Sequence, residues 1–306
     1  MTKMRVAILG GGLMGHGIAQ VFACAGHETR ITDPSSTVRR EIVARIGSHL
    51  DDLDLDRAAL ARIQVCDTVE EAVAGAQYVT EAAPEDLSLK QELFGRVERV
   101  ASPDAILASN TSVIPITQVM QSVSLKARAL GTHWWNPPYL VPLVEVIRTA
   151  WTSNDVVATT MALMASIGKQ PAEVKKDVPG FIGNRLQHAL WREAISLVEN
   201  GVCDAATVDA VVKSSFGRRL AVLGPLENSD MVGVDLTQSI HRYVLPHLDR
   251  STAPSPLLDQ MVGEGKLGFK TGEGFYAWSA ESQAALRRTV MNHLKASHSA
   301  PALSGA

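Results

Sequence analysis

Cysteine is scarce in this sequence, because the 306 residues include only three, Cys24, Cys66 and Cys203. The three lie far apart and form no C-x-x-C pair, so the sequence indicates neither a disulfide framework nor a zinc site, and we expect no bound metal. Isolated cysteines of this kind favour a reducing compartment, and we expect a cytoplasmic protein.

The chain also lacks an excess of charge of either sign and a long hydrophobic run. Its formal net charge is −3, which leaves no basic surplus for nucleic-acid phosphates or an anionic membrane surface. The first apolar stretch, VAILGGGLMG, contains several glycines and is closed by His16, so it is too short to cross a bilayer. We therefore expect a globular protein whose partner is a small molecule, and neither a nucleic acid nor a membrane.

Short β-prone runs alternate with segments of helical period from residue 4 to about residue 176. This alternation predicts an α/β fold of Rossmann type, a doubly wound and mostly parallel sheet with helices on both faces. After KKDVPG the apolar spacing becomes three and four, which predicts an all-α second domain. The breakers in DVPG place the boundary, and we predict domains of 1–178 and 179–306. The candidate strands are RVAIL, HETRIT, RIQV, YVTEA, AILAS, RALGTH, LVEVI and PAEVKK.

A glycine fingerprint follows the first strand. RVAILGGGLMGHGIA places Gly10, Gly12 and Gly15 in a G-x-G-x-x-G arrangement at the start of a helix. The first glycine permits a tight turn, the second lets the backbone approach a pyrophosphate, and the third allows close packing of helix on strand. Leu13 and Met14 fill the variable positions and join the predicted cofactor-binding residues. The spacing alone also fits a plain strand-to-helix turn.

The second strand ends at Asp33, 18 residues after Gly15. A carboxylate at this position can accept hydrogen bonds from both hydroxyls of a ribose and repels a 2′-phosphate, so it predicts NAD rather than NADP. An aspartate here can also be the N-cap of the next helix. Capping does not explain the upstream glycines, and we therefore favour the cofactor site.

Glu145 is embedded in the apolar run LVEVI, where an ionised side chain is costly to bury without a partner. His133 ends the preceding strand, and the proline-rich turn between the two can bring neighbouring strands together. If the side chains meet, the carboxylate accepts an imidazole N–H and leaves the other nitrogen to act as a base. Spacing alone does not separate this pair from a structural ion pair or from a glutamate in solvent.

Six stretches follow one another along nearly the whole chain, from the fingerprint ILGGGLMGHGIA to LGFKTGEGFYAW near the C-terminus. Together they resemble the 3-hydroxyacyl-CoA dehydrogenase family. The resemblance implies an NAD-dependent oxidoreductase of fatty acid metabolism that acts on a CH–OH group, with His133 as the base and Glu145 as its partner. The helical second domains of this family pack against a partner, which implies a homodimer through the C-terminal domain. The stretches are ILGGGLMGHGIA, VTEAAPEDLSLKQELF, ASNTSVIPIT, GTHWWNPP with LVEVI, KDVPGFIGNRL and LGFKTGEGFYAW.

The resemblance also implies roles for five further polar residues. Ser112 would bond to the substrate hydroxyl or the nicotinamide region, and Asn184 would help to hold the substrate oxygen. Glu85 and Lys90 would line the cofactor cleft, and Asn136 would lie close to the nicotinamide. Simpler structural roles are the alternatives. Ser112 would cap the helix that follows it, Glu85 and Lys90 would form a solvated pair, and Asn184 would bond only its own helix.

Different stretches of the sequence resemble different branches of the family, so the substrate class stays open. GPLENSDMVGVD and LGFKTGEGFYAW resemble the acyl-CoA branch, so a 3-hydroxyacyl-CoA such as 3-hydroxybutyryl-CoA is the first expectation. HWWNPPYLVPLVEVI and NRLQHAL resemble relatives that act on L-gulonate, L-carnitine or pyridine carboxylates.

The segment after the second strand adds to this conflict. Arg39, Arg40 and Arg45 lie where CoA-using members hold the CoA phosphate, but the segment ends in an acidic run. A non-catalytic NAD-binding or structural protein is a third possibility, which the joint presence of His133, Glu145, Ser112 and Asn184 disfavours.

Overall fold

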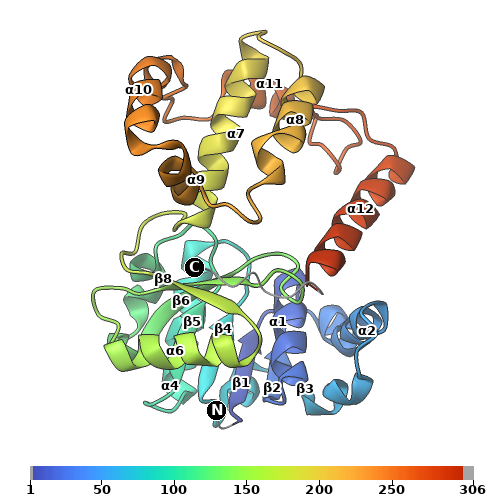
Figure 1. The fold of residues 1–306 in the computed structure, drawn as a ribbon. Coiled ribbons are helices and arrows are strands. Elements are labelled where there is room, and N and C mark those ends of the chain that lie inside the picture. The colour runs from blue at the N-terminus through green and yellow to red at the C-terminus, as the bar shows by residue number, and fades with distance from the viewer. Residues whose placement is uncertain (1–2, 299–306) are drawn as a thin grey trace. The chain divides into compact units, whose positions relative to one another are not determined.

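The computed structural model describes residues 3–298, which form two compact units divided after Arg185. The first unit contains an eight-stranded sheet in the order β3-β2-β1-β4-β5-β6-β7-β8 (Figure 1). Every neighbouring pair is parallel except β6 and β7, so the predicted doubly wound, mostly parallel sheet is confirmed. The strands are β1 (Arg5–Leu9), β2 (Glu28–Thr32), β3 (Ile63–Cys66), β4 (Tyr78–Glu81), β5 (Ile106–Ser109), β6 (Ala129–Trp134), β7 (Leu143–Ile147) and β8 (Gln170–Val174).

Helices cover both faces of this sheet because side chains alternate along each strand. In β1, Val6 and Ile8 pack into one core with α1, α2 and α6, whereas Ala7 and Leu9 pack into another with α3, α4 and α5. The helices of this unit are α1 (Leu13–Cys24), α2 (Ser36–Asp52), α3 (Val69–Val73), α4 (Leu87–Val100), α5 (Ile116–Val119) and α6 (Asn154–Ser166), with 3₁₀ turns η1 (Arg57–Arg62), η2 (Met120–Ser122) and η3 (Lys126–Arg128).

The carboxyl ends of the parallel strands bring the predicted site residues to one edge of the sheet. Gly10 follows β1, Asp33 follows β2, Glu85 lies beyond β4 and Ser112 lies beyond β5. The strand order turns back between β1 and β4, which is the kind of switch point where open α/β sheets bind ligands.

The second unit is helical over residues 186–293, as predicted, and Leu294–His298 at the end of α12 group with the first unit. Its helices α8, α9, α10 and α11 contain no fully buried side chain. No helix among residues 3–298 is long and apolar enough to span a membrane. The helices that run into or form this unit are α7 (Gly183–Glu199), α8 (Ala205–Ser214), α9 (Pro225–Val232), α10 (Val234–Val244), α11 (Pro256–Gly263) and α12 (Ala280–His298), with 3₁₀ turns η4 (Phe216–Arg218) and η5 (Leu245–His247).

The boundary predicted at residue 178 lies seven residues before the division of the two units at Arg185. Residues 179–185 group with the first unit, and they include Ile182 and Gly183, whose amides bind Glu145 of the sheet. The 178 boundary itself stays a prediction.

Candidate active site

The three fingerprint glycines are required for different reasons. Gly10 has a φ of 110°, and a Cβ atom there would lie 2.6 Å from the carbonyl oxygen of Ala82. A Cβ at Gly15 would lie only 1.7 Å from the carbonyl oxygen of Gly10, so only glycine allows α1 to begin so close to β1. A Cβ at Gly12 would meet nothing within 4 Å.

The open space at Gly12 fits a dinucleotide pyrophosphate. Gly12 is the N-cap of α1 and no side chain caps this helix. The first amides of a helix have no partner within the helix and attract anions. Leu13, the first residue of α1, is 62% exposed, so the helix terminus is accessible at this point.

The carboxylate of Asp33 is oriented by two backbone amides. Its Oδ2 accepts a hydrogen bond from the Gly11 amide at 2.9 Å, and its Oδ1 accepts one from Ser35 at 2.8 Å. The N-cap of α2 is Ser35, whose side chain accepts from Val38, so the alternative that Asp33 caps this helix is wrong. Asp33 is thereby held beside the glycine fingerprint, where a carboxylate favours ribose hydroxyls over a 2′-phosphate.

Lys90 is fully buried and forms an internal ion pair that the sequence analysis did not identify. Its Nζ lies 2.6 Å from Glu81 Oε1 and 3.5 Å from Glu85 Oε2. The other oxygen of Glu81 accepts a hydrogen bond from Ser109 Oγ at 2.6 Å. The alternative of a solvated Glu85–Lys90 pair is therefore wrong for Lys90, and a direct contact of Lys90 with the cofactor stays a prediction. The glutamate within the strand YVTE was the available signal for this pair.

Glu85 organises the loop after β5. Its Oε1 accepts hydrogen bonds from Thr111 Oγ1 at 2.6 Å, from the Ser112 amide at 2.9 Å and from the Val113 amide at 3.0 Å. Burial raises the pKa of the Glu85 carboxyl, but these hydrogen bonds and the nearby Lys90 ammonium outweigh burial and bring the pKa below its ordinary value. Glu85 is thus an ionised anchor for the loop that carries Ser112.

His133 and Glu145 stand directly opposite each other in the antiparallel pair β6–β7. His133 Nδ1 lies 2.7 Å from Glu145 Oε2, and the two residues are only 4% and 1% exposed. The other carboxylate oxygen accepts hydrogen bonds from the amides of Ile182 at 2.9 Å and Gly183 at 3.0 Å. The alternative that Glu145 lies in solvent is therefore wrong.

The hydrogen bonds keep Glu145 ionised although it is buried. Burial raises the pKa of the Glu145 carboxyl, but hydrogen bonds from His133, Gly183 and Ile182 outweigh it and lower the pKa below the ordinary 4.5. An ionised carboxylate accepts the Nδ1 proton of His133, so Nε2 is the nitrogen left to accept a proton. The rings of Trp135 and Phe181 lie 5.4 and 5.7 Å from the imidazole and provide an apolar surround.

One hydrogen bond links Asn184 to Ser112 beside the His133–Glu145 pair. Asn184 Nδ2 donates to the carbonyl oxygen of Ser112 at 2.8 Å, so the alternative that Asn184 bonds only its own helix is wrong. The first amides of α5 are bound by Asp177, and no side chain caps this helix from its N-cap position, so Ser112 does not serve as its cap. The four predicted catalytic residues thus lie in one chain of neighbours from Ser112 through Asn184 and Gly183 to Glu145 and His133.

Asn136 is exposed and begins the loop that follows β6, with a cis peptide bond to Pro137. A second asparagine, Asn110, was not among the predicted site residues. Its Oδ1 accepts a hydrogen bond from the Trp134 amide at 2.8 Å and ties the end of β6 to the end of β5. Its place in the ASNTS stretch was the only signal for it.

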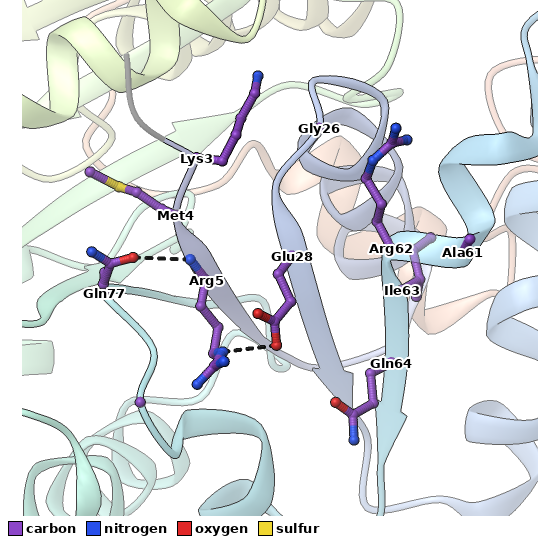
Figure 2. A pocket seen from close by; sticks show the side chains of 11 residues that line it. Lys3, Met4, Arg5, Gly26, Glu28, Ala61, Arg62, Ile63, Gln64 and Gln77 are labelled. Carbon is purple, nitrogen blue, oxygen red and sulfur yellow. Dashed lines mark hydrogen bonds and ion pairs between the residues drawn. The ribbon is translucent and has the colours of Figure 1, made fainter.

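Figure 2 shows a hollow at the opposite edge of the sheet, at the amino ends of β1, β2 and β3. Arg5 and Glu28, the first residues of β1 and β2, line it and are joined by a 2.8 Å ion pair. The predicted cofactor and catalytic residues all lie at the carboxyl edge, so we assign this hollow no part in the chemistry.

Family models match almost the entire chain. The model described as 3-hydroxyacyl-CoA dehydrogenase, NAD binding domain, matches residues 5–178, and the model for the C-terminal domain matches residues 180–278. NAD is therefore the cofactor, and the cradle at Gly12 together with the Asp33 carboxylate fits it.

Several relatives with different substrates in their names are similar to this chain. A 5-formyl-3-hydroxy-2-methylpyridine 4-carboxylate 5-dehydrogenase of Mesorhizobium japonicum is 37% identical over 92% of this chain and 93% of its own. An L-carnitine dehydrogenase of Streptomyces griseus is 38% identical over 81% and 79%. A probable 3-hydroxybutyryl-CoA dehydrogenase of Bacillus subtilis is 35% identical over 92% and 100%.

A solved structure named as the same pyridine-carboxylate dehydrogenase, and described as an NAD⁺-dependent dismutase, superimposes with a TM-score of 0.91. It is 34% identical in sequence, and the match covers 97% of both chains.

The first prediction concerns cofactor choice. Replacing Asp33 with alanine should weaken NAD binding by about 10- to 100-fold, because hydrogen bonds to a charged group contribute roughly 1.5–3 kcal/mol. The affinity for NADP should rise relative to the affinity for NAD, because the repulsion of a 2′-phosphate is removed. Titration of both cofactors measures this. Asp104→Ala removes an exposed carboxylate just before β5, at the amino edge of the sheet, and should change neither affinity.

The second prediction concerns Glu145. Glu145→Gln should lower kcat by about 100-fold or more, because the amide neither fixes the His133 tautomer nor offsets the charge on the imidazole. NAD affinity should stay within a factor of about two, since Glu145 is not part of the predicted cofactor cradle. The matched control Glu173→Gln, on β8, should keep kcat. Equal kcat values for both variants would contradict the assignment.

Glu145 also predicts a pH dependence of stability. Because its pKa is lower in the folded state, its contribution to the free energy of unfolding is present above the ordinary value of 4.5 and is lost as the pH falls through the lowered value. The stability difference between wild type and Glu145→Gln should therefore shrink from pH 7 towards pH 3, as measured by urea unfolding.

Proposed function

Because the chain belongs to the 3-hydroxyacyl-CoA dehydrogenase family, we propose that it oxidises the hydroxyl group of a small carboxylate that is not attached to coenzyme A. Whatever its substrate, the chain is an NAD-dependent oxidoreductase that acts on a CH–OH group. The buried His133–Glu145 pair is the observation that carries the chemistry of this proposal.

In the proposed reaction, His133 Nε2 accepts the hydroxyl proton of the substrate. Glu145 stabilises the imidazolium that forms, and its ionised state before the reaction means that no proton has to leave it first. Ser112 and Asn184 hold the reacting oxygen. Bound NAD supplies a hydride acceptor. A hydrated aldehyde presents the same H–C–O–H unit as an alcohol, so the pyridine substrate in the name of one relative is compatible with this base.

The remaining predicted residues take supporting roles in this proposal. Asp33 binds the adenosine ribose, and Glu85 and Lys90 hold the loops that face the cofactor. Asn136 lies next to the nicotinamide. The fingerprint residues that receive the pyrophosphate are Gly10, Gly12, Leu13, Met14 and Gly15.

The arginines of α2 support a substrate without coenzyme A. Arg39 forms an ion pair with Asp67 at 3.1 Å and donates to the Asp33 carbonyl, and Arg45 forms an ion pair with Glu41. Two of the three arginines that would meet a CoA phosphate are thus already engaged. The high similarity of the solved pyridine-carboxylate enzyme supports the same substrate class.

A 3-hydroxyacyl-CoA is the second candidate. The description of the family and the full-length similarity to the Bacillus subtilis relative favour it. The Arg40 side chain donates a hydrogen bond to Thr37 Oγ1 at 3.1 Å and forms no ion pair with residues 3–298, which leaves one cation of α2 for a phosphate.

A substrate panel gives the third prediction. NADH formation should be followed with 3-hydroxybutyryl-CoA, 3-hydroxybutyrate, L-gulonate, L-carnitine and 5-formyl-3-hydroxy-2-methylpyridine 4-carboxylate at one pH. We expect at least one free carboxylate to exceed the CoA ester in kcat/KM by about 100-fold, and His133→Ala to lower kcat by about 100-fold or more.

A preference for the CoA ester by orders of magnitude would instead establish the acyl-CoA activity. NAD binding without turnover of any compound would support a non-catalytic protein. Full turnover by His133→Ala would remove the histidine from its proposed role.

The fourth prediction is a homodimer formed through the second unit. Large apolar side chains are exposed on α9 and α10, among them Leu226 at 80% and Tyr243 at 78%. Exposed apolar surface of this kind marks an association site. Light scattering should give twice the chain mass, and the double variant L226E/Y243E should be monomeric. Leu55→Glu, an exposed apolar position in the first unit, should stay dimeric.

The cytoplasmic location also stays part of the proposal. It rests on the three free cysteines, whereas some relatives are named as mitochondrial enzymes.

A further inference from the structure

Lys169 is a buried cation that forms no ion pair with an acidic side chain of residues 3–298. It lies in the turn between α6 and β8 and is 7% exposed. Its Nζ donates hydrogen bonds to the carbonyl oxygens of Pro138 and, at 3.0 Å, Val141. The same ammonium lies 5.5 Å from the ring centroid of Trp134. Two carbonyls and an aromatic face therefore take the place of a carboxylate.

The carbonyls that Lys169 binds belong to the segment 135–142, which has few other means of fixing its backbone. Pro137, Pro138 and Pro142 have no amide hydrogen, and proline cannot donate to a strand. The amides of Leu140 and Val141 both donate to the Pro137 carbonyl, at 3.0 Å each. The Pro142 carbonyl accepts from the amide of Gln170, the neighbour of Lys169.

The other side of the segment packs on the helices next to the cofactor fingerprint. A Cβ at Gly17 of α1 would lie 2.6 Å from Pro138 Cγ, so the proline ring fills the space that this glycine leaves. The ring of Tyr139 lies 4.5 Å from that of His49 on α2. The segment is thus held between Lys169 on one side and α1 and α2 on the other.

The two ends of the segment lead to the base and its carboxylate. Trp135, 5.4 Å from the His133 ring, begins it, and Pro142 ends it one residue before β7, which carries Glu145. The Trp135 ring also covers Gly183, where a Cβ would lie 2.4 Å from its Cζ2. A shift of the segment would therefore move the aromatic wall beside the imidazole.

We propose that Lys169 is a positioning residue that sets substrate selectivity by fixing the segment 135–142 beside the His133–Glu145 pair. This inference rests on the proposed function, because selectivity has a meaning only for an enzyme that turns over a substrate. The placement of the segment by Lys169 is separable from it and is measurable without turnover. Burial lowers the pKa of Lys169 to about 8, in keeping with an ammonium that the fold holds at a cost.

The fifth prediction tests Lys169→Met, which keeps the length of the side chain and removes the charge and the donors. Hydrogen–deuterium exchange in the absence of substrate should be about 10-fold or more faster at the Leu140 and Val141 amides, because local opening costs less. Amides of β1 and β4 should exchange as in wild type. Lys175→Met, which removes an exposed lysine just beyond β8, is the matched control and should leave the exchange unchanged.

The kinetic arm compares the best and second-best substrates of the wild type. In Lys169→Met, kcat/KM for the best substrate should fall by about 10-fold or more, since a displaced wall misaligns the reacting atoms. The ratio of the two kcat/KM values should move towards one, and the Kd for NAD should change by less than about twofold. Lys169→Arg, which keeps the charge and the donors, should restore part of the ratio. If Lys169→Met does not fold, Lys169→Gln takes its place in both arms.

Unchanged exchange at Leu140 and Val141 overturns the inference. Faster exchange with an unchanged selectivity ratio overturns the selectivity role, because a merely structural lysine gives that result. Faster exchange together with a ratio of the two kcat/KM values closer to one supports the selectivity role of Lys169. If the wild type turns over no substrate, the proposed function fails, and the exchange measurement still decides whether Lys169 fixes the segment.

Discussion

The carboxylate of Glu145 is the constraint on which the site depends. A buried charge without partners costs several kcal/mol, so Glu145 is tolerated only while its donors stay in place. They come from β6, through His133, and from the chain just before and at the start of α7, through Ile182 and Gly183. One side chain therefore contacts the opposite strand of an antiparallel pair through His133 and the start of a helix whose next residue, Asn184, reaches Ser112.

Two further carboxylates at the carboxyl edge of the sheet also have donors from within the protein. Glu81 binds Lys90 and Ser109, and Glu85 binds backbone amides of the loop that contains Ser112. Loops that surround a cofactor have few ladder hydrogen bonds of their own, and a carboxylate with several acceptor sites supplies them. Because these carboxylates are satisfied internally, the loops are organised before any ligand binds, which is the pre-organisation that catalysis by positioning needs.

Local pattern was enough to predict much of this molecule. All eight candidate strands form. The central strands, β1 and β4 to β7, are buried on both faces and therefore appear in the sequence as short apolar runs. Glycine spacing with an acidic strand end predicted the NAD cradle. The hydrogen bond between Asn184 and Ser112 joins residues 72 positions apart, and the capping of α5 by Asp177 spans 61. No local pattern encodes such contacts. The alternative of a solvated Glu85–Lys90 pair was wrong for the same reason, because an ion pair looks alike in sequence whether it is buried or solvated.

Relatives of this chain carry names with pyridine, carnitine and acyl-CoA substrates, so membership of the family does not by itself determine which molecule is oxidised. In our proposal, substrate selectivity comes from surfaces next to the His133–Glu145 pair and not from the pair itself. The segment 135–142 is such a surface, since it touches α1 and α2 through side chains but is held by carbonyl contacts. Backbone carbonyls are available to Lys169 whatever side chains the segment bears. In our proposal, a changed side chain in this segment leaves the Lys169 contacts in place but alters the packing of Pro138 and Tyr139 on α1 and α2. Substrate choice would then change without a change in the His133–Glu145 pair.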